Sequence, residues 1–479
     1  MHKSRRLAIA IAAGTILVGS FAIPASAAPA ANAAPATKTS PDTKTVSAAK
    51  PAPAPGASAV AVTSLNRAQT VTVRRDLRAG TVARTHGTVN LCARAGLACQ
   101  LEALTASPSS ASPLASHVAQ LGYGARELQK AYGLTGAKTT PGTVALVGTG
   151  TYSSLAADLA VYRSANGLPA CTVAAGCLRI VNQSGGTKLE PLPTAPGQLR
   201  GEEDLASETA LDVDMVSAAC PSCRILVVAL PLKDGYFPTN TARANQQFRD
   251  FGAGVTTAIR LGARGVSISY GLPKSTYSDT VAAVPFRHPG VVITASSGDQ
   301  GANGDHPTWP QNLATVISAG GTSLHPSGAG FRQSAWDGAG SGCSRDLGPA
   351  VGQPAAVASA CGGHRATSDL SAVADPATGV SVYDSFAPAT GVPYGFTVFG
   401  GTSASAPFLA AMNVRAGVRS TTVGPNQLYR APAGSITDIT TGRNAFDTCP
   451  EKDLRECHAG AGWDGPTGLG TPNGLAAFG

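Results

Sequence analysis

The chain has 479 residues, of which 43% are hydrophobic and only 13% are charged, and its formal net charge is +8. This length allows one large domain with a sizeable core. The formal net charge is +3 in residues 1–27 and +6 in residues 28–110, so residues 111–479 have a net charge of −1. Because the body of the chain is nearly neutral and carries no nucleic-acid motif, we expect no nucleic-acid partner.

Residues 1–27 have the pattern of a secretory signal peptide. Three basic residues precede an apolar run from Leu7 to Ile23, and the segment ends in Ala25-Ser26-Ala27. No later apolar run is long enough to span a bilayer. We therefore predict a secreted, extracellular protein with no membrane contact after signal removal, and we expect a monomer.

Two segments follow before the main folded region. Residues 28–60 are rich in Ala, Pro, Thr and Ser, a composition that cannot bury enough apolar surface to fold and that is typical of a linker. Residues 61–115 carry six arginines and some strand-like runs, which indicates a short pro-segment. Residues 116–479 are then predicted to form a single large domain.

The ten cysteines indicate disulfides, because the chain is predicted to be exported. Pairing between neighbours in the sequence is the simplest arrangement: Cys92/Cys99, Cys171/Cys177, Cys220/Cys223, Cys343/Cys361 and Cys449/Cys457. The Cys220-Pro221-Ser222-Cys223 spacing also occurs in dithiol redox motifs. It follows a predicted helix instead of opening one, so we favour a structural bridge there.

From about residue 122 onward, short apolar runs alternate with helical segments. The predicted strands are Thr143–Val147, Arg224–Leu230, Gly265–Ser269, Val291–Ala295 and Ala314–Ala319, and the predicted helices are Leu155–Asn166, Leu205–Ala219 and Val255–Leu261. The strands are apolar almost throughout, as buried parallel strands are. This alternation predicts an α/β fold with a parallel central sheet covered by helices on both faces.

A candidate nucleophile, Ser403, lies in the stretch Gly400-Gly401-Thr402-Ser403-Ala404-Ser405-Ala406-Pro407. A strand-like run precedes this stretch and a helical run follows it, with Pro407 expected in the first helical turn. Thr402 and Ser403 could simply cap the helix. The stretch is not the G-x-S-x-G elbow, because position 405 is serine. The function of Ser403 therefore depends on which base lies beside it.

Carboxylates are better candidates for this base than histidine. His86 lies in a Thr-His-Gly-Thr sequence, but it precedes the first core strand, and Gly148 stands where a subtilisin would carry its aspartate. Glu208 and Asp212 are four residues apart on a predicted helix and so share one face. Taken alone, such a pair is more often a solvated face. If buried, the two would share a proton, as an acid–base relay requires.

Asp299 follows a buried strand, at the edge of the sheet where ligand sites of α/β proteins lie. By itself it could be an ordinary turn residue. Ser267 and Ser269, in the predicted strand Gly265–Ser269, and Gly271 just after it could contact the backbone of a substrate that pairs with the chain as an extra strand. An ordinary buried strand end explains these three residues equally well.

Three segments together resemble the active site of the sedolisins, the serine-carboxyl peptidases. They are Glu208-x-x-Leu211-Asp212, Ala295-Ser296-Ser297-Gly298-Asp299 and Gly401-Thr402-Ser403-Ala404-Ser405-Ala406-Pro407, in this order. The resemblance extends from about residue 123 to the last residue and implies a subtilisin-like fold. It implies that Ser403 attacks the peptide carbonyl, Glu208 is the base, Asp212 orients Glu208, and a protonated Asp299 faces the oxyanion.

The same resemblance implies one Ca²⁺ site within residues 435–473. Its ligands would be the carboxylates of Asp438 and Asp464 and the backbone carbonyls of Ile439, Gly460 and Gly462, an all-oxygen set that suits a hard cation. The alternative is a Gly-rich turn held by side-chain hydrogen bonds. No other cofactor is expected.

The sequence thus predicts a secreted, acid-active serine-type endopeptidase that cleaves protein or peptide substrates through a Ser-Glu-Asp triad and an acyl-enzyme. A tripeptidyl exopeptidase on the same fold is an alternative, and so is a catalytically silent relative that binds peptides. Two departures from the family border the expected cleft. Leu205 stands where Trp is common, and the loop after the first strand lacks the usual aspartate. The family's pro-segment is also usually much longer.

Overall fold

The computed structural model describes residues 63–79, 85–92, 96–110, 112–117, 119–190, 200–304, 307–387, 394–417, 424–445, 449–450 and 452–479. They belong to one compact unit, residues 58–479. The predicted signal peptide and linker, residues 1–60, lie outside the described residues. None of the helices in the described ranges is long and apolar enough to cross a membrane.

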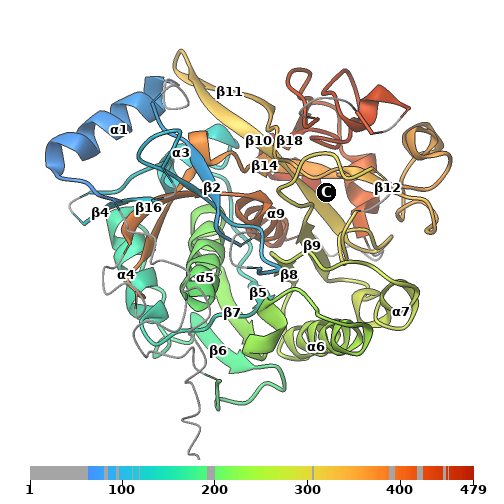
Figure 1. Ribbon diagram of the computed structural model, residues 1–479, viewed down its shortest axis with the longest axis horizontal. Helices are drawn as coiled ribbons and strands as arrows, with labels where there is room; N and C mark the ends of the chain where they lie inside the picture. Colours follow the sequence, from blue (N-terminus) through green and yellow to red (C-terminus); the bar gives the residue numbers. More distant parts are fainter. Residues whose placement is uncertain are drawn as a thin grey trace, which may run out of the picture. The chain divides into compact units, whose positions relative to one another are not determined.

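The core of the unit is an eight-stranded sheet (Figure 1). Its strands, in spatial order, are β11 (Gly330–Ala335), β10 (Ile317–Ser327), β9 (Val292–Ser296), β8 (Gly265–Ile268), β5 (Thr143–Gly148), β7 (Arg224–Ala229) and β6 (Leu178–Asn182), with β14 (Leu370–Val373) also paired to β10. All neighbours are parallel except β10 and β11, which form an antiparallel hairpin. The predicted α/β class with a parallel central sheet is confirmed.

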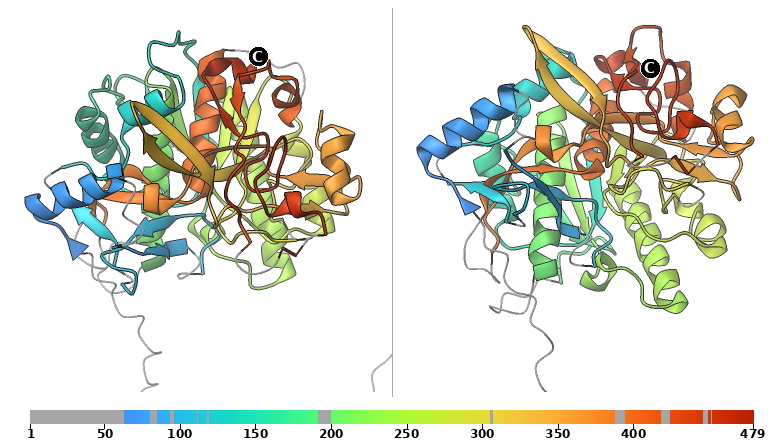
Figure 2. Two further views of the ribbon diagram at one scale, coloured as in Figure 1. Left: turned by 90° about the horizontal axis from the view of Figure 1, so that it is seen from above. Right: turned by 45° about the horizontal axis from the view of Figure 1, so that its top comes forward.

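Helices cover both faces of this sheet, as the apolar character of its strands requires. The helices are α1 (Arg67–Ala79), α3 (Ala125–Ala131), α4 (Leu155–Ala165), α5 (Arg200–Ala219), α6 (Thr241–Arg260), α7 (Thr276–Thr280), α8 (Ala355–Ala358) and α9 (Thr402–Ala416). Helices α5 and α9 pack against each other, and α9 also contacts β8, β9, β10 and β14. Helix α6 packs on β5 and β7, and Figure 2 shows it across the sheet from α9.

A second sheet joins the predicted pro-segment to the strand that leads into α9. Its spatial order is β1 (Thr63–Ser64), β4 (Leu114–Ser116), β16 (Gly395–Gly400), β3 (Glu102–Leu104) and β2 (Thr88–Asn90), with β15 (Val380–Asp384) also paired to β16. Short ladders also join β12 (Gly342–Ser344) to β13 (Arg365–Thr367) and β17 (Ile436–Thr437) to β18 (Thr471–Pro472). The residues predicted as a pro-segment are therefore packed within the same unit as the rest of the chain.

The predicted elements exist, but several boundaries differ. Helix α6 begins 14 residues before the predicted Val255, because its first half is mostly polar and has few apolar residues to mark a helical period. The run from Ala314 is a turn up to Val316, and strand β10 begins only at Ile317. Pro407 was expected in the first turn of its helix, but α9 begins at Thr402 and places Pro407 in the helix interior. All five predicted disulfides are present.

Candidate active site

Ser403 is the second residue of α9, directly after the turn that joins β16 to this helix. Gly401 makes the turn with φ of 92°. A Cβ at this position would lie 2.1 Å from the carbonyl oxygen of Gln100 and 2.6 Å from Oδ2 of Asp299, so only glycine fits. The turn thus holds the candidate nucleophile on a buried helix whose first backbone N–H group donates to Asp299.

The two predicted dyad carboxylates lie on α5, which packs against α9. Asp212 Oδ1 accepts a hydrogen bond of 2.7 Å from the Ser269 hydroxyl. The Ser403 hydroxyl donates to the carbonyl oxygen of the same Ser269, at 3.4 Å. Glu208 is buried near both hydroxyls, and its Oε1 has no hydrogen-bond partner among the described residues. The structure therefore brings Ser403, Glu208 and Asp212 together around the end of β8.

Burial dominates the electrostatics of the dyad. It raises the pKa of Glu208 well above the ordinary value of a glutamate, and the nearby Asp212 raises it further, whereas the nearby hydroxyl of Ser403 lowers it. Burial also raises the pKa of Asp212 to about 8, against the opposing effect of the Ser269 hydrogen bond. Two carboxyls so placed hold at least one proton between them over a wide pH range.

Asp299 follows β9 and faces the N-terminus of α9. Its Oδ1 accepts hydrogen bonds from the backbone N–H and the hydroxyl of Thr402, both at 2.8 Å. Its Oδ2 is buried and has no hydrogen-bond partner among the described residues. Burial raises the pKa of Asp299 to about 7, although the bonds from Thr402 act in the opposite direction. A protonated Oδ2 is thus available to donate a hydrogen bond beside Ser403.

A segment that the sequence did not assign to the site lies across it. We call residues 96–101 the strap. The N–H of Gln100 donates to the carbonyl of Ser269 at 3.2 Å, and the N–H of Gly271 donates to the carbonyl of Ala98 at 2.8 Å. On its other edge, the N–H of Ala98 donates to the carbonyl of Gly235 at 2.8 Å. The strap therefore forms one antiparallel bridge on each side, from Leu97 to Tyr236 and from Cys99 to Tyr270.

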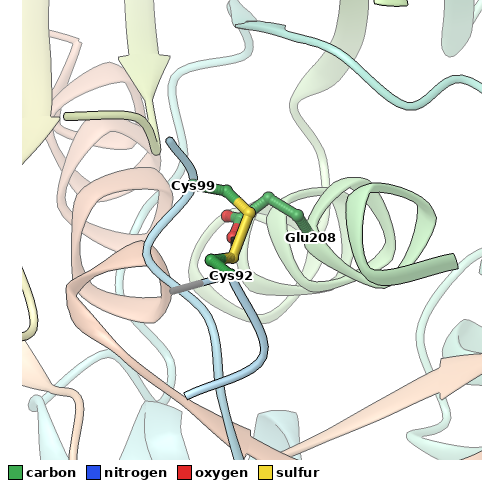
Figure 3. A group of neighbouring side chains, drawn as sticks. All are labelled: Cys92, Cys99 and Glu208. Carbon is green, nitrogen blue, oxygen red and sulfur yellow. Dashed lines mark hydrogen bonds between the residues drawn. A yellow bond between two sulfur atoms is a disulfide. The ribbon is translucent and has the colours of Figure 1, made fainter. Parts of the chain in front are cut away.

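The disulfide between Cys92 and Cys99 holds the strap against the dyad. Figure 3 shows this bridge directly beside the carboxylate of Glu208, and Cys92 Sγ lies 4.0 Å from Glu208 Oε2. Cys92, Cys99 and Glu208 are close enough together for a metal site, but sulfurs that are bonded to each other are not available as ligands. The pairing of these cysteines was predicted. Their contact with Glu208 has no signal in the sequence.

Hydrogen bonds connect the two segments that carry the predicted calcium ligands. The N–H of Gly462 donates to Asp438 Oδ2 at 2.8 Å, and the N–H of Gly460 donates to Asp464 Oδ2 at 3.0 Å. Asp464 is fully buried, and Ile439 lies next to Asp438 with its side chain buried. Both carboxylates thus accept backbone N–H groups of this loop, as in a turn held by side-chain hydrogen bonds, and their oxygens together with the loop carbonyls are a donor set that suits a hard metal ion.

Comparison with known proteins supports the interpretation of the fold. The chain is 31% identical to kumamolisin from Bacillus sp. (strain MN-32) over 299 residues, which are 56% of this chain and 49% of kumamolisin. It is 37% identical to tripeptidyl-peptidase sed1 from Aspergillus fumigatus over 115 residues, which are 23% of this chain and 15% of that protein. The chain thus spans half or less of the curated relatives it matches. No protein-family model matches it.

Among solved structures, Pseudomonas sedolisin, a serine-carboxyl proteinase complexed with two molecules of pseudo-iodotyrostatin, shares the fold. The TM-score is 0.57 at 20% sequence identity, and the match covers 75% of this chain and 98% of that one. The chain thus has the subtilisin-like fold of Pseudomonas sedolisin, and part of it is similar in sequence to kumamolisin.

Proposed function

We propose that this chain is a secreted, acid-active serine-type endopeptidase of the sedolisin kind, which cleaves proteins or peptides. The observation that carries the proposal is the convergence of Ser403, the Glu208–Asp212 dyad and Asp299 at the end of the central sheet. Ser403 attacks the carbonyl and Glu208 takes its proton, while Asp212 orients Glu208 and shares its proton. The N–H of Ser403 and the protonated Asp299 stabilise the oxyanion.

The cleft geometry supports an endopeptidase over a tripeptidyl exopeptidase, which the partial similarity to tripeptidyl-peptidase sed1 keeps as a second candidate. On the N-terminal side of Gln100, more than three residues of the strap are paired with the rest of the chain. Leu97 forms a β-bridge with Tyr236, and the N–H of Phe237 donates to the carbonyl of Gly96 at 3.1 Å. Five residues, 96–100, are thus accommodated up to the carbonyl that faces Ser403. A tripeptidyl exopeptidase would accommodate only three residues on this side of the cleaved bond.

The test of the function is the pH–rate profile for hydrolysis of a denatured protein, with product lengths read by mass spectrometry. With the strap in place, the pKa of Asp299 is raised to about 7. Asp299 therefore loses the proton that it would donate to the oxyanion when the pH rises to about 7. Water that enters an open cleft lowers this value. We therefore expect activity below neutral pH, falling towards pH 7, with internal cuts. An optimum above neutral would show that the base is wrongly assigned.

Asp299→Ala is expected to lower kcat by about 10²–10³, the usual cost of losing one oxyanion donor. Asp299→Asn keeps a neutral donor at every pH, so it should lose less activity than Asp299→Ala. The activity that remains should extend to higher pH than that of the wild type. Asp346→Asn is a control at an exposed aspartate paired with Lys274. The assignment fails if Asp299→Asn shows the same alkaline limb as the wild type.

We also propose that the Asp438–Asp464 loop binds one Ca²⁺ through the carboxylates and the backbone carbonyls of Ile439, Gly460 and Gly462. The ion would hold the loop to β17 and β18. At a free Ca²⁺ concentration 100 times its Kd, the ion adds about 2.7 kcal/mol to the free energy of unfolding. A calcium chelator should therefore lower Tm by several degrees, as followed by differential scanning calorimetry.

The matched variants for the calcium prediction are Asp438→Asn and Asp453→Asn. Asp438→Asn should have a reduced Tm that no longer responds to the chelator. Asp453 is bonded to Arg455 instead, so Asp453→Asn should respond as the wild type does. A wild-type Tm that is the same with calcium and with chelator would refute the site.

A further inference from the structure

A pair of aspartates lies behind one edge of the candidate cleft. Asp234 belongs to η2 (Leu232–Gly235), a short 3₁₀ helix, and Asp250 lies on α6. The carboxyl groups of the two residues lie beside each other, and both side chains are buried. The proposed chemistry of Ser403 uses neither of them.

Three of the four carboxyl oxygens of this pair have no hydrogen-bond partner among the described residues. They are both oxygens of Asp234, which is fully buried, and Oδ2 of Asp250. The fourth oxygen, Oδ1 of Asp250, accepts hydrogen bonds from the side-chain amides of Gln183 and Gln246, both at 2.8 Å. Because a buried, ionised carboxylate without partners costs much free energy, the neutral form of Asp234 is favoured in this environment.

The charged groups that face Asp234 come from two elements. Lys233, on η2, has its Nζ 3.5 Å from Asp250 Oδ2, and Arg243 and Asp250 approach from α6. Burial, and then the charge of Asp250, raise the pKa of Asp234 to about 8, against the opposite effect of Lys233 and Arg243. Burial also acts to raise the pKa of Asp250, but its hydrogen bonds to side-chain amides, its contact with Asp234 and the charge of Lys233 lower it overall.

The pair is therefore one neutral carboxyl group, on Asp234, beside one carboxylate, on Asp250. Two buried carboxyl groups so placed do not both ionise over most of the pH range. The ammonium group of Lys233 already supplies a positive charge beside Asp250. A shared proton thus suits this pair better than a bound metal ion.

The cleft edge, by which we mean residues 235–237, overlaps the end of η2 and continues beyond it. The carbonyl of Gly235 accepts the N–H of Ala98 at 2.8 Å. A substrate in the cleft would pair with the same main-chain groups, because an extended peptide adds to such an edge irrespective of its side chains. Helix α6 holds this edge from behind, since the side chain of Gln247 donates to the carbonyl of Tyr236 at 2.6 Å.

We propose that Asp234 is a positioning residue for peptide binding, and that one proton shared between Asp234 and Asp250 holds the cleft edge against α6. Protonated Asp234 donates its O–H to Oδ2 of Asp250, which gives two of the three unpartnered oxygens a partner. The inference rests on the proposed peptidase function, because the peptide that the edge binds is the substrate of that function. When the proton is lost, two negative charges face each other and the contact becomes repulsive.

The shared proton makes the cleft edge most stable at acidic pH. When the edge opens, Asp234 meets water, and its pKa returns towards the ordinary value of about 4. Since the pKa is higher while the edge is closed, the stabilisation is fully present below about pH 4 and is lost progressively as the pH rises to about 8. Each pH unit in this window favours opening by up to about tenfold.

Hydrogen–deuterium exchange of the full chain, read by mass spectrometry on the peptide that covers residues 232–237, measures this opening. The chain carries Ser403→Ala here, so that proteolysis does not interfere, and exchange is corrected for its intrinsic rate at each pH. Between about pH 5 and about pH 7 the corrected exchange should rise by about 10- to 100-fold. Asp234→Asn, added to the same chain, keeps a neutral donor towards Asp250, so its corrected exchange should change by less than about threefold.

Steady-state kinetics of the chain with its serine intact separates binding from chemistry. Asp234→Ala leaves Asp250 Oδ2 without a donor and should raise KM for a denatured protein by about tenfold, with kcat within about twofold of the wild type. Asp234→Asn should restore the low KM. Circular dichroism verifies that both variants fold.

The matched control for both measurements is Asp158→Asn, on α4. Asp158 is also buried, but it accepts a hydrogen bond from the hydroxyl of Ser385 at 2.6 Å. Its replacement can reduce stability, because it changes this buried bond. It should change neither KM nor the pH dependence of exchange at residues 232–237.

The outcomes separate this inference from the proposed function. The same pH dependence of exchange with Asp234 and with Asn at this position would overturn the shared proton, even in an active peptidase. An unchanged KM in folded Asp234→Ala would overturn the positioning role and leave the function standing. A chain that hydrolyses no substrate at any pH would overturn the proposed function and the positioning role together, while the exchange measurement would still decide whether the proton is shared.

Discussion

Ser403→Ala is expected to lower kcat/KM for a denatured protein by about 10⁴ or more, because loss of the nucleophile leaves only binding and the oxyanion donors. The hydroxyl at position 403 donates to the carbonyl of Ser269, near Glu208, whereas the neighbouring hydroxyls of Ser269 and Thr402 donate to Asp212 and Asp299. Nearby Ser405 is turned away, and its hydroxyl accepts the N–H of Ala372.

The matched control for Ser403→Ala is Ser381→Ala. Ser381 is also fully buried, and its hydroxyl has no hydrogen-bond partner among the described residues. Its replacement should leave kcat/KM unchanged. A fluorophosphonate probe gives a second readout, because it should label the wild-type protein on Ser403 and fail to label Ser403→Ala. Activity above a tenth of wild type in Ser403→Ala would exclude Ser403 as the nucleophile.

The positions of Glu208, Asp212 and Asp299 in the fold could be predicted from the sequence, because local geometry determines where these residues lie. A spacing of four residues puts Glu208 and Asp212 on one helical face irrespective of the rest of the fold. The end of a buried parallel strand puts Asp299 at the carboxyl edge of the sheet. The possibility that Ser269 and Gly271 line a substrate backbone was open in the sequence. The structure shows a peptide segment paired with both, and the segment belongs to the chain itself.

The strap could not be predicted because backbone groups hold it. The hydrogen bonds from Gln100 to Ser269 and from Gly271 to Ala98 involve no side chain, and they join positions about 170 residues apart. Long-range main-chain pairing has no periodicity or residue preference that marks its partner in a single sequence. The cysteine pair Cys92/Cys99 indicates a closed loop. Its place beside Glu208 becomes evident only when β2 and β3 are seen to pair next to β16.

The position of Pro407 shows how a local rule can give the wrong boundary. The missing N–H of proline suits the first turn of a helix, so the sequence placed Pro407 there. Helix α9 instead begins at Thr402, after the sharp turn at Gly401. An N–H at position 407 would have bonded to the carbonyl of Ser403 within the helix. The proline therefore leaves this carbonyl without its usual helical partner, at the residue proposed as the nucleophile.

Glu208→Gln and Asp212→Asn should both reduce kcat strongly, but they should affect its pH dependence differently. Glutamine cannot accept the proton of Ser403, so Glu208→Gln should lower kcat by about 10²–10⁴, the usual contribution of a general base. Asp212 is the largest charged influence that raises the pKa of Glu208. In Asp212→Asn this influence is removed, so the pKa of Glu208 should fall and the acid limb of the profile should move to lower pH.

The control for this pair is Asp214→Asn, on the same helix. Asp214 is buried, but its carboxylate accepts the N–H of Tyr383 and does not contact the site. Its replacement can reduce stability but should leave the acid limb where it is in the wild type. If Asp212→Asn loses activity with no shift of the acid limb, Asp212 does not act through the charge of Glu208. If Glu208→Gln retains most of the wild-type kcat, the proton of Ser403 goes elsewhere, and the carboxylate-based mechanism is wrong.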